Sequence, residues 1–320
     1  MNINYKTYGD LLLDIKHNLH KIPSNIDLVV GIPRSGMIPA YILGFALNVK
    51  VCSLDEFVEG IYTQNGERPL KNSRKINNIL IVDDSVASGN AMNKAKNIIQ
   101  KMNLSMEFNL HFCAVYVNPV SYHYVDIALT ELAMPRIFQW NYLNHPFIKH
   151  SCFDIDGVLC VDPTEEENDD GEKYLNFISN AKPLYIPKYK IRALVTSRLE
   201  KYREKTEEWL KKHEVQYNEL YMLDLPSKEE RLKTHGIHSQ FKASIYKKLK
   251  DCVLFYESNR EQAIEIANIT GKTVFSVETD ELINNKTVSI NEYKRKTFFK
   301  HIIIKIFYLC VPANRQKRIK

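Results

Sequence analysis

Two adjacent carboxylates, Asp83 and Asp84, follow a short apolar run in "ILIVDDSVASGNAM" at residues 79–92. Neighbouring carboxylates repel each other, so holding two of them together is costly unless they bind something. Small residues around one glycine follow at once, and such a turn into a helix lets backbone N–H groups approach a phosphate. Carboxylates also accept hydrogen bonds from sugar hydroxyls. The stretch therefore predicts a sugar phosphate site, whereas an isolated pair of aspartates would indicate only a capped strand.

This stretch resembles the phosphoribosyl-pyrophosphate signature of the type I phosphoribosyltransferases, and "VVGIPRSGMIPA" at residues 29–40 resembles the pyrophosphate loop of that family. The resemblance implies that Asp83 and Asp84 bind the ribose 2′- and 3′-hydroxyls. It implies that Arg34, Ser35 and Gly36 bind the pyrophosphate group, with a bridging Mg²⁺ ion. It assigns the 5′-phosphate to the loop of Ala87, Ser88, Gly89, Asn90 and Ala91. The family loop commonly ends in threonine instead of alanine, so one hydroxyl contact is missing here.

The implied reaction displaces pyrophosphate from C1 of the ribose. Positive charge develops on the sugar and negative charge on the leaving group, and Mg²⁺ and Arg34 would stabilise the latter. The polar stretch at residues 56–75 is expected to close over the site and exclude water, as such loops do in this family. Its candidates for reaching the diphosphate are Arg68, Lys71 and Arg74; a solvated basic loop is the alternative.

A second motif, "CFDIDGVLC" at residues 152–160, places Asp154 after another apolar run and Asp156 two residues later. With "LVTSR", "FKASIYKKLK" and "LFYESNREQA" downstream, it resembles the motifs of haloacid-dehalogenase-like phosphatases. The resemblance implies that Asp154 attacks phosphorus and forms an aspartyl-phosphate. It implies that Asp156 protonates the leaving oxygen and then activates water. It also implies that Thr196 and Lys242 bind the phosphoryl oxygens.

The same resemblance implies an Mg²⁺ site formed by Asp154, the Asp156 backbone carbonyl and Glu257, since Mg²⁺ prefers oxygen ligands. Many relatives carry aspartates in the last motif, so contact between Glu261 and the metal stays open. Lys242 could instead be an ordinary surface lysine, because two further lysines lie nearby.

Only a short segment separates Asp156 from Thr196, and it is expected to hold little beyond an acidic, solvated loop at residues 162–173. Relatives that act on small metabolites often carry a large cap domain in such a position. Either the site is open to a bulky substrate, or the first domain serves as its lid.

Apolar runs alternate with amphipathic stretches along the chain, which predicts an α/β fold of two Rossmann-like parallel-sheet domains in tandem. A phosphoribosyltransferase domain is expected at residues 1–148 and a phosphatase domain at 149–292, followed by a basic tail at 293–320. A helix is predicted at residues 89–102. The strands are predicted at residues 27–32, 78–84, 110–117, 150–159, 191–197, 218–224, 251–258 and 272–277.

Composition indicates a folded protein of a reducing compartment. The 320 residues are 44% hydrophobic and 26% charged, and the six cysteines form no Cys-x-x-Cys pair. The N-terminus lacks a signal-peptide pattern. The sequence contains no run of eighteen apolar residues, so no membrane-spanning helix is expected. The formal charge is +6, but residues 294–320 carry nine Lys/Arg and no Asp/Glu. The body is therefore slightly acidic, and no nucleic-acid partner is expected.

The basic tail predicts a peripheral membrane anchor. A helix over residues 297–310 would gather apolar side chains on one broad face, while cations attract anionic lipids. The alternative is a core helix with a disordered basic end. Cytoplasmic location at the inner face of the cell membrane is expected. The apolar face would consist of Phe298, Phe299, Ile302, Ile303, Ile306 and Leu309.

Together, the two resemblances predict a bifunctional enzyme. The first domain would transfer ribose 5-phosphate from phosphoribosyl pyrophosphate, and the second would hydrolyse the 5-phosphate to leave ribofuranose. The combination resembles phosphoribosyltransferase–phosphatase pairs of bacterial surface polysaccharide biosynthesis, with a lipid-linked or polymeric glycan acceptor. One alternative is a nucleobase phosphoribosyltransferase with a nucleotide 5′-phosphatase. Another is a regulator that senses phosphoribosyl pyrophosphate without catalysis. The acceptor sugar, linkage, anomeric outcome and oligomeric state are not predicted.

Overall fold

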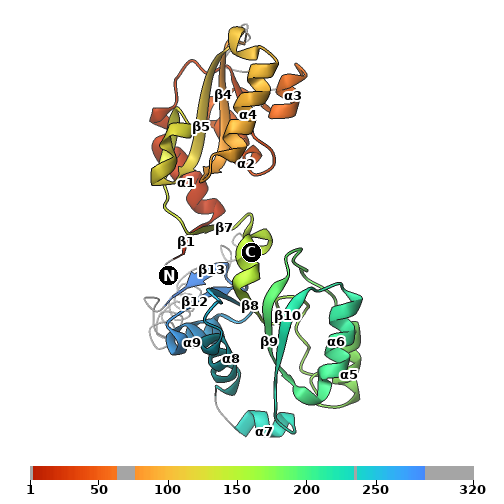
Figure 1. Ribbon diagram of the computed structural model, residues 1–320. Coiled ribbons are helices and arrows are strands. Elements are labelled where there is room, and N and C mark those ends of the chain that lie inside the picture. The colour runs from red at the N-terminus through yellow and green to blue at the C-terminus, as the bar shows by residue number, and fades with distance from the viewer. Residues whose placement is uncertain (1–2, 63–75, 234–235, 285–320) are drawn as a thin grey trace, which may run out of the picture. The chain divides into compact units, whose positions relative to one another are not determined.

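The computed structural model describes residues 3–62, 76–233 and 236–284 (Figure 1). The chain divides into two compact units between residues 142 and 143. The border predicted after residue 148 lies inside the second unit, within η5 (Pro146–His150). In the described ranges, no helix combines the length and the apolar character that crossing a membrane requires.

Two of the predicted features fall outside the described residues. They are the C-terminal amphipathic helix and the three candidate cations of the loop, Arg68, Lys71 and Arg74.

The first unit contains a five-stranded parallel sheet with strand order β3-β2-β4-β5-β6. Its two faces carry separate apolar clusters, because alternate residues of each strand point to opposite sides. Helices α1 and α2 cover one face, and α3 and α4 cover the other. A small parallel pair, β1 with β7, forms a separate sheet. The strands are β1 (Asn4–Lys6), β2 (Leu28–Gly31), β3 (Lys50–Ser53), β4 (Asn78–Val86), β5 (Asn109–Val117), β6 (Ile127–Glu131) and β7 (Arg136–Phe138). The helices are α1 (Tyr8–Asn18), α2 (Met37–Leu47), α3 (Leu54–Val58) and α4 (Asn90–Lys101).

The second unit contains a six-stranded sheet with strand order β10-β9-β8-β11-β12-β13. Five strands are parallel as predicted, whereas β13 runs antiparallel to β12. Helices α8 and α9 bury their apolar residues against the sheet. The strands are β8 (Ser151–Phe153), β9 (Ile191–Leu199), β10 (Tyr217–Leu223), β11 (Leu254–Glu257), β12 (Thr273–Ser276) and β13 (Glu281–Ile283). The helices are α5 (Glu172–Asn180), α6 (Arg203–Lys212), α7 (Lys228–Lys233), α8 (Ile237–Lys248) and α9 (Arg260–Thr270).

The segment between Asp156 and Thr196 holds more than the expected acidic loop, because helix α5 begins where that loop ends. Apolar side chains of α5 are buried, and the Trp209 indole of α6 donates a hydrogen bond to the Ala181 carbonyl just after α5, at 2.8 Å. The helix was missed because its first turn continues the acidic run. The remaining short helices are η1 (Leu19–Lys21), η2 (Leu104–Met106), η3 (Pro119–Tyr124), η4 (Tyr142–Asn144) and η6 (Glu200–Tyr202).

Candidate functional site

The two motifs predicted to bind phosphoribosyl pyrophosphate lie side by side at the carboxyl ends of β2 and β4. These strands are parallel neighbours, with Gly31 opposite Val82. The loop after β2 reaches Asp84, because the Ser35 hydroxyl donates to Asp84 Oδ1 at 2.8 Å. A Cβ on Gly36 would lie 2.5 Å from the Ile32 carbonyl oxygen, so only glycine fits there. The Arg34 side chain is exposed and able to reach a ligand.

The Asp83 and Asp84 side chains are buried beside each other. Burial raises the pKa of Asp83 well above its usual value, and repulsion from the Asp84 carboxylate raises it further. Arg136 of β7 acts in the opposite direction, and its guanidinium donates to the Leu132 carbonyl at 2.9 Å. The uncompensated negative charge suits hydroxyl donors and a cation brought in by a ligand.

The predicted 5′-phosphate loop leads from β4 into α4. Gly89 precedes the helix with a positive φ of 74°, and a Cβ there would lie 2.5 Å from the Tyr124 ring. Gly89 forms no side-chain cap, and the first N–H groups of a helix have no partner within the helix, so the start of α4 is suited to binding an anion. Ser88, Asn90 and Ala91 are exposed, and Asn90 and Ala91 form the first turn of the helix.

Trp140 is a residue of this site that sequence reasoning missed. Its indole N–H donates to Asp84 Oδ2 at 2.7 Å, so each Asp84 oxygen accepts from one neutral donor. The ring stacks on Phe138 with a centroid distance of 4.7 Å and lies 5.6 Å from the exposed Tyr8 ring. No local pattern announces this contact, because Trp140 follows β7, far along the chain from Asp84.

In the second unit, the structure brings together Asp154, Lys242 and Glu257. Asp154 follows β8, Glu257 ends β11 and Lys242 lies on α8. The Lys242 ammonium donates to Asp154 Oδ2 at 2.6 Å and to Glu257 Oε2 at 2.7 Å. All three side chains are buried, so Lys242 is not a surface lysine. Thr196 is buried within the neighbouring strand β9.

Burial and the charges of the neighbouring groups both shift the pKa values of this cluster. Burial raises the pKa of Asp154 to about 7, the Lys242 ammonium opposes the rise, and the Glu257 and Asp156 carboxylates add to it. Burial lowers the pKa of Lys242, but attraction to Asp154 and Glu257 outweighs burial and raises it overall. The lysine therefore stays charged between two carboxylates.

Asp156 is held by a second buried cation, Arg198 of β9, which sequence reasoning also missed. The Arg198 Nη2 donates to Asp156 Oδ1 at 2.6 Å, and Nε donates to both carboxylate oxygens at 3.2 and 3.1 Å. The only signal in the sequence is the arginine two residues after Thr196.

Two of the predicted metal ligands, Asp154 and Glu257, belong to this cluster. Within the described ranges, no three His, Cys, Asp or Glu side chains are grouped to hold a metal ion. Lys242 instead lies between Asp154 and Glu257. The three acidic side chains still outnumber the two buried cations, and their oxygen donors fit Mg²⁺. Glu261 is exposed in the first turn of α9.

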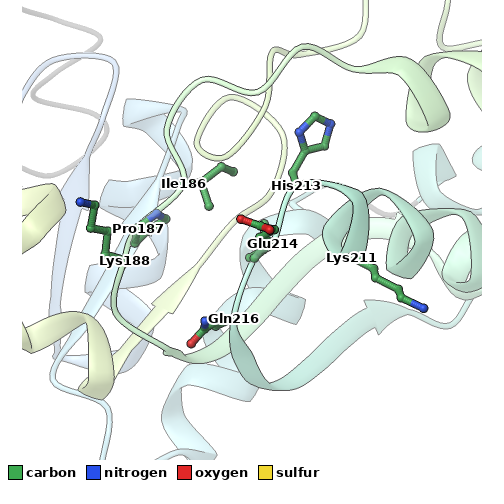
Figure 2. A pocket seen from close by; sticks show the side chains of 8 residues that line it. Ile186, Pro187, Lys188, Lys211, His213, Glu214 and Gln216 are labelled. Atoms are coloured by element: carbon green, nitrogen blue, oxygen red, sulfur yellow. The ribbon is translucent and has the colours of Figure 1, made fainter.

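Two pockets of the second unit differ in their relation to these residues. A pocket of about 560 Å³ is lined by Asp162, Ser258, Asn259 and Gln262 among others, and the last of these accepts a hydrogen bond from Lys242. The larger pocket, about 770 Å³, lies where the chain enters β9 and β10 (Figure 2). Parallel α/β sheets bind ligands at the opposite, carboxyl ends of their strands. The smaller pocket is therefore the one that adjoins the candidate chemistry.

Comparison with known proteins agrees with the first motif. Residues 5–140 match the family model described as phosphoribosyl transferase domain. A xanthine-guanine-hypoxanthine phosphoribosyltransferase from Helicobacter pylori is 17% identical, with 44% of this chain and 93% of that chain covered and a TM-score of 0.34. A purine phosphoribosyltransferase from Pyrococcus horikoshii is 19% identical, with coverages of 44% and 94% and a TM-score of 0.31. None of the curated proteins matches the chain. Residues 5–140, which match the phosphoribosyl transferase domain model, carry both motifs predicted to bind phosphoribosyl pyrophosphate.

Proposed function

We propose that the chain transfers ribose 5-phosphate from phosphoribosyl pyrophosphate to a glycan acceptor and then hydrolyses the 5-phosphate, leaving ribofuranose. The phosphoribosyl transferase domain supports the first step. The observation that carries the second step is the buried contact of Lys242 with Asp154 and Glu257. A buried charged cluster costs stability unless it is fully paired, so its retention points to chemistry.

In the first step, N–H groups at the start of α4 hold the 5′-phosphate and the ribose hydroxyls donate to Asp83 and Asp84. Arg34 attracts the pyrophosphate as negative charge develops on it. Bound Mg²⁺ would add to this stabilisation of the leaving group. The acceptor hydroxyl then forms the new bond at C1 as the bond to pyrophosphate breaks, and the hydroxyl proton leaves with the pyrophosphate.

In the second step, the Asp154 carboxylate attacks phosphorus while the bond from phosphorus to the ribose oxygen breaks. Asp156 gives a proton to that oxygen, and Thr196 and Lys242 bind the phosphoryl oxygens. Asp156 then takes a proton from a water molecule that attacks phosphorus, the bond to Asp154 breaks and inorganic phosphate leaves. Bound Mg²⁺ would offset negative charge among the carboxylates and the phosphoryl group.

The pocket beside Lys242 supports a sugar as the leaving group. Its lining offers the Ser258 hydroxyl, the Asn259 and Gln262 amides and the Asp162 carboxylate. Hydroxyls of a sugar can pair with each of these groups.

The basic tail supports a polymeric or lipid-linked acceptor at the cytoplasmic face of the membrane. Deleting residues 294–320 should release the protein into the soluble fraction, and salt should weaken the membrane binding of the intact chain. Equal partition of intact and truncated proteins onto anionic vesicles at low salt contradicts this part of the proposal.

A nucleobase acceptor agrees equally well with the family match, and hydrolysis of a nucleotide would then follow. It leaves the cationic tail without a role. Turnover of a free nucleobase, unaffected by deletion of the tail, would favour this second function. A sensor without catalysis would bind phosphoribosyl pyrophosphate and release no pyrophosphate with any acceptor.

The mass of the product tests whether the two steps form one pathway. Asp154→Asn removes the attacking carboxylate and leaves Arg34, Asp83 and Asp84 unchanged. With phosphoribosyl pyrophosphate and a membrane glycan extract, this variant should yield a product bearing a pentose plus phosphate. The wild type and the matched control Asp251→Asn, an exposed position of the same unit, should yield the pentose alone. Equal product masses from wild type and Asp154→Asn contradict the proposal.

A further inference from the structure

Arg198 is a charged side chain whose exposed fraction is 0%. A buried guanidinium is tolerated only when its charge is paired and its N–H groups are hydrogen-bonded. In addition to its contacts with Asp156, Nη2 lies 3.4 Å from Cys160 Sγ and Nη1 donates to Thr206 Oγ1 at 3.4 Å. The guanidinium is therefore surrounded by protein partners and is not presented to a substrate phosphate.

The two oxygens of Asp156 are held unequally. Among the described contacts, Oδ1 accepts from Nη2 and Nε of Arg198 and from Cys160 Sγ, whereas Oδ2 accepts from Nε alone. The Asp156 side chain retains 18% of its exposure. The arginine thus fixes the carboxylate plane and leaves Oδ2 with unused acceptor capacity.

We propose that Arg198 is a positioning residue of the phosphatase step, which holds Asp156 so that Oδ2 exchanges the proton with the ribose oxygen. This inference rests on the proposed function of the second unit. Arg198 acts through Asp156 and does not touch the phosphoryl group. Its loss should therefore lower kcat where proton transfer matters and leave KM nearly unchanged.

Two substrates separate proton transfer from phosphoryl transfer. The alkoxide of ribose 5-phosphate needs a proton to leave, and a positioned acid contributes roughly 10²–10⁴-fold to such steps. The p-nitrophenolate of p-nitrophenyl phosphate leaves readily without a proton. A positioning role predicts unequal losses on these two substrates, whereas a damaged fold or a lost phosphate contact predicts equal ones.

The experiment compares Arg198→Lys, Asp156→Asn and the double variant of the full chain on both substrates with Mg²⁺. Arg198→Lys should lower kcat about 10²-fold on ribose 5-phosphate and less than about tenfold on p-nitrophenyl phosphate. The double variant should be no slower than Asp156→Asn, because the two residues act as a unit. Arg203→Lys is the matched control, since Arg203 pairs with Glu200 and Glu207 away from Asp156, and it should behave as wild type.

Equal losses on the two substrates, a raised KM for both, or additive losses in the double variant overturn the role of Arg198 while the phosphatase step stands. A wild type that hydrolyses neither substrate overturns the phosphatase assignment and the inference with it. If Arg198→Lys fails to fold by circular dichroism, Arg198→Gln retains an amide donor, and the same outcomes apply to it.

Discussion

The two units hold their carboxylates in contrasting ways. In the first unit, Asp83 and Asp84 are neighbours, and the latter accepts hydrogen bonds from an uncharged hydroxyl and an uncharged indole. In the second unit, two buried cations, Lys242 and Arg198, each contact carboxylates directly. Neutral donors do not cancel the negative charge of Asp84, whereas Lys242 and Arg198 offset the charges of Asp154, Glu257 and Asp156 within the protein. The contrast predicts that removing a charge has opposite effects on stability in the two units.

The largest expected effect is the loss of the Lys242 ammonium. Lys242→Met leaves Asp154 and Glu257 buried without their shared cation, which typically costs about 3–5 kcal/mol. Urea unfolding followed by circular dichroism should record this loss for the second unit. The control Lys247→Met, exposed on the same helix, should change stability by less than about 0.5 kcal/mol. Similar midpoints for the two variants would contradict the contrast.

Removal of a charge from the first unit should have the opposite sign. The raised pKa of Asp83 means that ionisation of this carboxyl opposes folding, so Asp83→Asn should raise the free energy of unfolding of the first unit at neutral pH. The same variant should lose pyrophosphate release, because a ribose hydroxyl loses its charged acceptor. Hydrolysis of p-nitrophenyl phosphate should continue, since Asp83 and the proposed catalytic residue Asp154 belong to separate units. A destabilised variant would show that Arg136 already balances the charge.

A smaller effect is expected from the indole donor. Trp140→Phe keeps an aromatic ring and removes the hydrogen bond to Asp84, so kcat/KM for phosphoribosyl pyrophosphate should fall roughly tenfold or more. Trp209→Phe is a matched control in the second unit, where the indole donates to the Ala181 carbonyl instead. It should lower the stability of that unit without changing pyrophosphate release. Equal kinetics for both variants would remove Trp140 from the site.

The smallest effect concerns acid stability of the second unit. Burial lowers the pKa of His145 to about 4, and its Nδ1 accepts a hydrogen bond from the Phe147 N–H. A lowered histidine pKa favours the neutral ring, so its stabilisation is complete above the ordinary value near pH 6.5 and is lost as the pH falls towards 4. Because the ring is partly exposed, we expect the loss to be about 1 kcal/mol. His145→Asn should flatten the dependence of the unfolding midpoint on pH between 6.5 and 4. An unchanged pH dependence would show that other groups cause it.

The sequence predicted the parts of each site that local pattern controls. The apolar run of β4 leads into Asp83 near the carboxyl end of that strand, which continues to Val86, and the apolar run of β8 ends just before Asp154. Both side chains therefore lie towards the carboxyl edge of a parallel sheet. Lys242 was predicted from order along the chain, and the structure places it against Asp154.

The partners of these residues could not be predicted in the same way. Trp140 contacts Asp84, and Arg198 contacts Asp156. Each contact joins residues far apart in the sequence, so no local hydrophobic pattern predicts it. The helix α5 (Glu172–Asn180) was missed because its first two residues were assigned to the acidic loop at 162–173, although Tyr174 and two later apolar residues have helical spacing. The reversed direction of β13 also depends on a turn and not on hydrophobicity.

The hydrogen bond from Trp140 to Asp84 also offers a way to follow ligand binding to the first unit by intrinsic tryptophan fluorescence. The chain has two tryptophans, and Trp209 is buried in the other unit with its indole committed to a backbone carbonyl. A ligand hydroxyl that donates to Asp84 would alter the surroundings of the Trp140 indole, and we expect its emission to change. Fluorescence titration of Trp209→Phe with phosphoribosyl pyrophosphate would therefore test occupancy of the proposed ribose site without any acceptor.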